Sequence, residues 1–113
     1  MTVDSDFSNV VKVDPNQVQL PAAPTNLTAI RQGGRQVRLT WRDNAWNETG
    51  FVIERSINGG AYFALVTIGP RFLTGNVNFT DRTVIRENRY TYRVAAINAT
   101  GMSAYSNTAT VNL

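Results

Sequence analysis

Apolar and polar residues alternate along most of this chain with a period of two, and this pattern constrains the fold more than any other feature. Val37, Leu39 and Trp41 alternate with polar neighbours, and the same kind of alternation returns in residues 51–54 and 90–97. A period of two places successive side chains on opposite faces of a β-strand. No stretch keeps a period of 3.6 residues, so the pattern predicts an all-β domain.

Turn-forming residues separate these short stretches. They are Gly33-Gly34, Asp43-Asn44, Asn58-Gly59-Gly60, Gly69-Pro70, Gly75-Asn76 and Gly101. Many short strands with frequent turns indicate a β-sandwich. The 113 residues leave room for one such domain with one modest core.

The composition excludes much of the usual chemistry of active sites. The chain has no cysteine and no histidine, so it has no disulfide, no thiolate or imidazole metal ligand and no Ser-His or Cys-His catalytic pair. No phosphate-binding or calcium-binding loop pattern is present either. We therefore predict a protein that is not an enzyme and that has no cofactor and no metal site.

The charge is basic and unevenly distributed. The net charge is +3, and all basic residues except Lys12 are arginines, whereas the first twenty residues are acidic. An arginine-rich surface in contact with solvent is the interpretation we favour. The alternative is a site for an anionic partner such as an acidic polysaccharide, a phosphate-bearing surface or nucleic acid.

An internal similarity indicates how the chain is organised. Residues 5–13 and residues 103–111 share Ser, an aromatic residue, Ser, Asn and a final Val at a constant offset of 98 residues. We interpret residues 1–13 as the C-terminal strand of a preceding, similar module. Residues 14–23 contain two prolines, with a third at Pro24, and are predicted to be a linker. Residues 24–113 are predicted to form the complete domain.

Six segments, taken in order and spacing, resemble fibronectin type III domains of the kind common in secreted and surface proteins of bacteria and archaea. They are residues 21–27, 37–41, 47–56, 79–81, 90–98 and 101–106. The resemblance covers residues 21–113. It implies a seven-stranded fibronectin type III or immunoglobulin-like β-sandwich, with one sheet of three strands and one of four.

The resemblance also assigns structural roles to individual residues. Tyr90 resembles the tyrosine-corner residue, whose hydroxyl bonds to the backbone just upstream. Val84 stands where the family usually has leucine. Glu54 and Arg93 are expected to form a cross-strand ion pair on an outer face. The expected core surrounds Trp41 and consists of Leu27, Leu39, Trp41, Phe51, Ile53, Tyr90, Tyr92 and Val94.

Three residues are candidates for contact with a ligand: Trp46, Met102 and Tyr105. Trp46 lies in a polar loop, where it either anchors a partner or folds back over the edge of the core. Met102 and Tyr105 follow a turn that this family often uses for recognition, and packing against the end of the sandwich is the alternative. Asp43 and Glu48 share a loop, and we expect them to cap turns and face solvent rather than form a glycosidase-type pair.

These features favour a non-catalytic spacer or interaction module of a larger secreted or cell-surface protein. Its expected partners are the neighbouring domains of the same polypeptide. Two alternatives stay open. One is a carbohydrate-binding accessory module of a polysaccharide-degrading enzyme, and the other is an adhesive module that binds a surface protein, although no Arg-Gly-Asp tripeptide is present. We expect an extracellular or cell-surface location, in a bacterium or archaeon. We do not expect nucleic-acid binding. We do not expect membrane insertion either, because no apolar run approaches the ~20 residues that span a bilayer.

Overall fold

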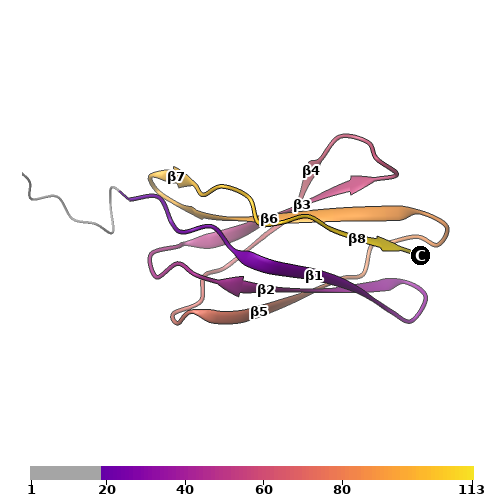
Figure 1. Ribbon diagram of the computed structural model, residues 1–113, viewed down its shortest axis with the longest axis horizontal. Helices are drawn as coiled ribbons and strands as arrows, with labels where there is room; N and C mark the ends of the chain where they lie inside the picture. Colours follow the sequence, from indigo (N-terminus) through magenta and orange to yellow (C-terminus); the bar gives the residue numbers. More distant parts are fainter. Residues whose placement is uncertain (1–18) are drawn as a thin grey trace, which may run out of the picture.

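Two antiparallel β-sheets face each other in the computed structural model, which describes residues 19–113 (Figure 1). The eight strands are β1 (Thr25–Gln32), β2 (Gln36–Asp43), β3 (Gly50–Ile57), β4 (Phe63–Ile68), β5 (Gly75–Asp81), β6 (Arg89–Asn98), β7 (Gly101–Met102) and β8 (Ala109–Asn112). The described residues contain no helix long and apolar enough to cross a membrane. The segment that was interpreted as the end of a preceding module, residues 1–13, lies outside the described residues, as do residues 14–18 of the linker.

The strand order confirms the sandwich that the sequence predicted. The smaller sheet has the order β1-β2-β5, and the larger sheet has the order β4-β3-β6, with both β7 and β8 paired to the far side of β6. The expected sheet of four strands is therefore present, but its last strand is divided into two short pieces. This division is why the structure has eight strands rather than seven.

Two serine side chains explain where the last strand divides. The hydroxyl of Ser103 accepts a hydrogen bond from the backbone N–H of Ala96 (2.9 Å), and the hydroxyl of Ser106 accepts one from the N–H of Val94 (3.0 Å). The N–H groups of both serines donate in turn to the carbonyl groups of the same two residues on β6. Because the hydroxyls take the place of backbone carbonyls, the chain can leave the regular ladder without leaving a buried N–H group unpaired.

The core lies between the sheets and contains all eight residues that the sequence assigned to it. Their exposed fractions are 3% or less. Trp41 is at its centre, and its ring meets the ring of Phe51 edge-on with 5.6 Å between the centroids. Val84 is buried in the same cluster, so a smaller side chain than leucine fills that place. Each fully buried large apolar side chain contributes about 1.5–3 kcal/mol through removal from water.

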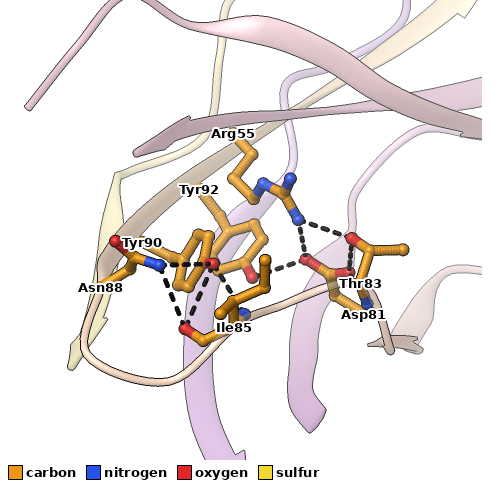
Figure 2. A network of polar contacts seen from close by, with 7 residues as sticks. All are labelled: Arg55, Asp81, Thr83, Ile85, Asn88, Tyr90 and Tyr92. Atoms are coloured by element: carbon orange, nitrogen blue, oxygen red, sulfur yellow. Dashed lines mark hydrogen bonds and ion pairs between the residues drawn. The ribbon is translucent and has the colours of Figure 1, made fainter. Parts of the chain in front are cut away.

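The tyrosine corner forms as expected. The hydroxyl of Tyr90 accepts a hydrogen bond from the backbone N–H of Ile85 (2.8 Å) and donates to the carbonyl of the same residue (3.3 Å), as Figure 2 shows. The side-chain amide of Asn88 also donates to this hydroxyl (3.4 Å). These bonds fix the connection between β5 and β6 against the start of β6.

A buried polar network next to the tyrosine corner joins the two sheets. Arg55 on β3 forms an ion pair with Asp81 at the end of β5, with 2.8 Å between Nη1 and Oδ2 (Figure 2). The same carboxylate accepts hydrogen bonds from the hydroxyl of Tyr92 (2.7 Å) and from the backbone N–H and hydroxyl of Thr83. Burial raises the pKa of Asp81, but the hydrogen bonds from Thr83, Tyr92 and Arg55 outweigh it and hold the pKa below its usual value.

The strands run from one end of the sandwich to the other, and a different set of connections forms each end. The connections 44–49, 69–74 and 99–100 meet at one end, which we call the loop end. The β1–β2 turn, the β5–β6 connection and the C-terminus of β8 meet at the opposite end, which we call the arginine end (Figure 1).

Candidate recognition site at the loop end

The strand register brings three connections together at the loop end. Asp43 at the end of β2 pairs with Gly75 at the start of β5, and Phe51 near the start of β3 pairs with Ile68 at the end of β4. The β2–β3 and β4–β5 connections therefore cross between the sheets side by side. The β6–β7 turn joins them, because β6 ends beside the start of β3.

Large apolar side chains project into solvent from these connections. Trp46 in the β2–β3 loop is 59% exposed, and Phe72 and Leu73 in the β4–β5 loop are 95% and 82% exposed. Isolated exposed apolar residues are common, but several on adjoining loops are typical of an interaction surface. The sequence analysis singled out Trp46, whose side chain does not fold back into the core. It missed Phe72 and Leu73, because their dipeptide follows Gly69-Pro70 and carries no distinctive pattern.

Hydrogen bonds hold the loops of this end in place. The Glu48 carboxylate accepts a hydrogen bond from the backbone N–H of Arg71 (2.9 Å), which ties the two long loops together. The side-chain amides of Asn47 and Asn98 both donate to the carbonyl of Gln19, at 3.1 and 2.8 Å. The chain before β1 is thus fixed between the β2–β3 loop and the β6–β7 turn.

Asp43 and Glu48 form a buried carboxyl pair beneath the loops. Their exposed fractions are 0% and 7%, so the expectation that they face solvent was wrong. Asp43 does cap a turn, because its Oδ1 accepts a hydrogen bond from the N–H of Ala45 (2.9 Å). Within residues 19–113, neither Asp43 Oδ2 nor Glu48 Oε1 has a hydrogen-bond partner, although both atoms are buried.

Burial raises the pKa of Asp43 to about 6, and the neighbouring Glu48 carboxyl raises it as well, against smaller lowering effects of the Ala45 N–H and the Arg71 charge. Residues 19–113 contain no group of three or more carboxylates that could hold a metal ion. The pair sits under the loops rather than in a cleft, so it suits the loop structure better than catalysis.

The other two candidate residues lie at different places. Met102 on β7 is at the loop end and is 40% exposed. Tyr105 lies between β7 and β8, where its ring covers the guanidinium of Arg93 at 3.8 Å and its hydroxyl donates to Glu54 (3.0 Å). The structure therefore brings Trp46 and Met102 to one end of the molecule and places Tyr105 on the outer face of the larger sheet.

The outer face of the larger sheet carries a stack of side chains around Arg93. Its guanidinium lies between the rings of Tyr62 (4.0 Å) and Tyr105. The expected ion pair with Glu54 is present, with 2.7 Å between Arg93 Nη2 and Glu54 Oε1. Because Arg93 covers one face of each ring, the two tyrosines do not form the continuous aromatic row that a flat sugar-binding platform uses.

The two sheets, their strand order and the tyrosine corner define an immunoglobulin-like β-sandwich. No protein-family model matches the chain. Among solved structures, an Fn3-like protein from Clostridium thermocellum is 30% identical over 81% of this chain and 92% of that chain, with a TM-score of 0.63. The chain belongs to the fibronectin type III family.

Other matches are to parts of longer chains. A titin fragment is 18% identical over 82% of this chain with a TM-score of 0.66, and the match spans 32% of that fragment. A β-1,2-glucanase from Parabacteroides distasonis is 22% identical over 84% of this chain with a TM-score of 0.68, and the match spans 13% of that enzyme. This chain therefore spans about a third or less of these proteins, and domains of its fold occur as modules in multidomain proteins, a glycosidase among them.

Proposed function

We propose that this chain is a non-catalytic interaction module of a larger secreted or cell-surface multidomain protein, and that it docks a neighbouring domain through the loop end. The observation that carries the proposal is the exposure of Trp46, Phe72 and Leu73 on adjoining, hydrogen-bonded loops. Apolar and aromatic side chains of this size form the centres of protein interfaces. Loops that are already fixed lose less conformational freedom when a partner binds.

The position of the chain before β1 favours a neighbouring domain as the partner. Gln19 is held between the β2–β3 loop and the β6–β7 turn, and Leu20 is 53% exposed beside Gly101. A domain that precedes residue 19 would therefore be joined to the module beside the loop end. A linked domain has a high effective concentration, so a modest apolar contact suffices to hold it. The similarity between residues 5–13 and 103–111 supports such a preceding module.

The test compares the module alone with the same module joined to its natural N-terminal neighbour. We expect the joined module to unfold at a higher temperature, because docking stabilises the folded state. The variant Phe72→Ser/Leu73→Ser should remove this increase and leave the isolated module unchanged, since both side chains are already exposed. Calorimetry measures both transitions.

Ile30→Thr is the matched control. Ile30 is an apolar residue on β1 that is 57% exposed and lies away from the loop end, and threonine keeps its β-branched shape. It should not change the increase. An equal unfolding temperature for the isolated and the joined module would refute docking to this neighbour and leave an adhesive contact with another protein as the remaining use of the surface.

The exposed indole of Trp46 also favours the carbohydrate-binding alternative, because sugar rings stack on tryptophan rings. Depletion binding to a panel of insoluble neutral polysaccharides tests this function. Binding that is lost in Trp46→Ala and kept in Phe72→Ser/Leu73→Ser would support a sugar site centred on Trp46. No depletion of the unmodified protein would rule out these polysaccharides as partners.

A further inference from the structure

Arginines that are far apart in the sequence gather at the arginine end. Arg35 lies in the β1–β2 turn, Arg82 directly follows β5, and Arg86 lies in the β5–β6 connection. The three side chains are exposed, and the described part of the chain offers none of them a hydrogen bond, ion pair or aromatic ring. Arg31 joins them at the end of β1 and bonds only to the carbonyl of Gly33 (3.0 Å).

The acidic residues do little to offset this charge. Residues 19–113 contain ten arginines and five acidic residues, a net charge of +5. Asp81 and Glu54 are engaged in ion pairs, and the other pair of carboxyl groups is buried at the loop end. Glu87 is the one exposed acid of the described residues that lies at the arginine end. The field at this end is therefore positive and attracts anions.

The backbone forms a hollow beside these arginines. The hollow has a volume of about 510 Å³ and is lined by Gln32, Gly33, Gly34, Arg35, Gln36 and Arg82. Gly33 has a φ angle of +65°, which favours glycine, and the Arg86 guanidinium lies so close to Gly34 that a Cβ atom there would meet Nη2 at 2.6 Å. Both glycines line the hollow, and the missing side chain at Gly34 leaves room for the Arg86 guanidinium.

We propose that this hollow binds the acidic sugar units of an anionic polysaccharide. Arg35 and Arg82 offer guanidinium groups to a carboxylate or sulfate group, with which arginine forms paired hydrogen bonds. The amides of Gln32 and Gln36 offer donors and acceptors to the sugar hydroxyls. The volume is in the range of small-molecule binding sites, about 300–1,000 Å³. None of the six lining residues is aromatic, which disfavours nucleic acid, since single-stranded bases need rings on which to stack.

The test measures binding of the 113-residue chain to soluble polysaccharides by affinity electrophoresis and calorimetry. The probes are polygalacturonate, which carries carboxylates, dextran sulfate, which carries sulfates, and uncharged dextran. We expect binding to a charged probe and none to dextran, and the preferred charged probe identifies the anionic group. In the variant Arg35→Gln/Arg82→Gln, we expect an affinity about tenfold or more weaker, because two charge-assisted contacts are lost.

The control is Arg42→Gln/Arg71→Gln, which removes the same charge at the loop end. Both control residues are exposed, and their guanidinium groups bond only to residues one or two positions away in the sequence. We expect the control to keep most of the affinity, and we expect the amide NMR signals of Gly33 and Gly34 to shift on binding. Equal weakening by both double variants would overturn the proposal, as attraction by net charge alone would explain it. No binding to either charged probe, or tighter binding to a DNA oligonucleotide, would overturn it as well.

Discussion

Replacing Asp81 by asparagine should test the buried network more severely than any other single change. The carboxylate accepts hydrogen bonds from Arg55, Tyr92 and both donors of Thr83, and its side chain is 1% exposed. Asparagine keeps the shape but leaves the Arg55 charge buried without its counter-ion. Breaking a buried ion pair from one side costs roughly 3–5 kcal/mol. Since domains of this size are stable by about 5–15 kcal/mol, the variant should be near the limit of folding.

Urea denaturation followed by tryptophan fluorescence measures this loss, because Trp41 passes from full burial to solvent on unfolding. Glu54→Gln is the matched control. It also breaks an arginine–carboxylate pair, but this pair joins neighbouring strands of one sheet on its outer face, where the Arg93 and Glu54 side chains are 27% and 16% exposed. We expect it to cost about 1 kcal/mol or less. Equal losses in the two variants, or a loss below about 1 kcal/mol for Asp81→Asn, would refute the reasoning that burial decides the value of these pairs.

Three further changes have outcomes that the structure determines. Because folding raises the pKa of Asp43 to about 6, the folded state holds the carboxyl proton more tightly than the unfolded state, and the free energy of unfolding should fall as the pH rises from about 4 to 6. A pH series of urea melts should show this slope, and Asp43→Asn should remove it. Tyr90→Phe removes the hydroxyl that bonds to the backbone of Ile85 and should cost about 0.5–1.5 kcal/mol in the same melts, whereas no measurable loss would show that the corner does not stabilise the fold. Gly50→Ala places a Cβ atom 2.7 Å from the carbonyl of Ile68 and should lower the melting temperature by several degrees; an unchanged value would show that the backbone relaxes freely there.

The sequence allowed the core to be predicted because the core follows from local patterns. The period of two places the inward side chains of β2 and β3 without any knowledge of their partners. The role of Tyr90 and the pair between Glu54 and Arg93 followed from the family resemblance, since both depend on residues at fixed distances along neighbouring strands. The pair between Glu54 and Arg93 could be predicted because the resemblance specifies which strands are neighbours.

The features that the sequence did not predict depend on contacts between loops. Asp43 was expected in solvent because it stands at a turn, yet it is fully buried, and the nearby Glu48 bonds to the β4–β5 loop. The gathering of Arg35, Arg82 and Arg86 likewise requires the β1–β2 turn and the β5–β6 connection to meet, although they are nearly fifty residues apart in the sequence. No periodicity or short motif encodes such meetings, because loop conformation depends on what the loop packs against.

The interruption between β7 and β8 has a consequence for how such modules coexist on one polypeptide. An outermost strand with a continuous row of free N–H and carbonyl groups is a template on which another strand can add. Here the hydroxyls of Ser103 and Ser106 occupy the N–H groups of β6, and the chain beyond them is paired for only two residues on one side and four on the other. A partly folded copy nearby therefore finds no long, regular edge on this side of the larger sheet. Where modules of similar sequence follow one another in a polypeptide, they are prone to exchange strands during folding, and a broken final strand lowers that risk at this edge.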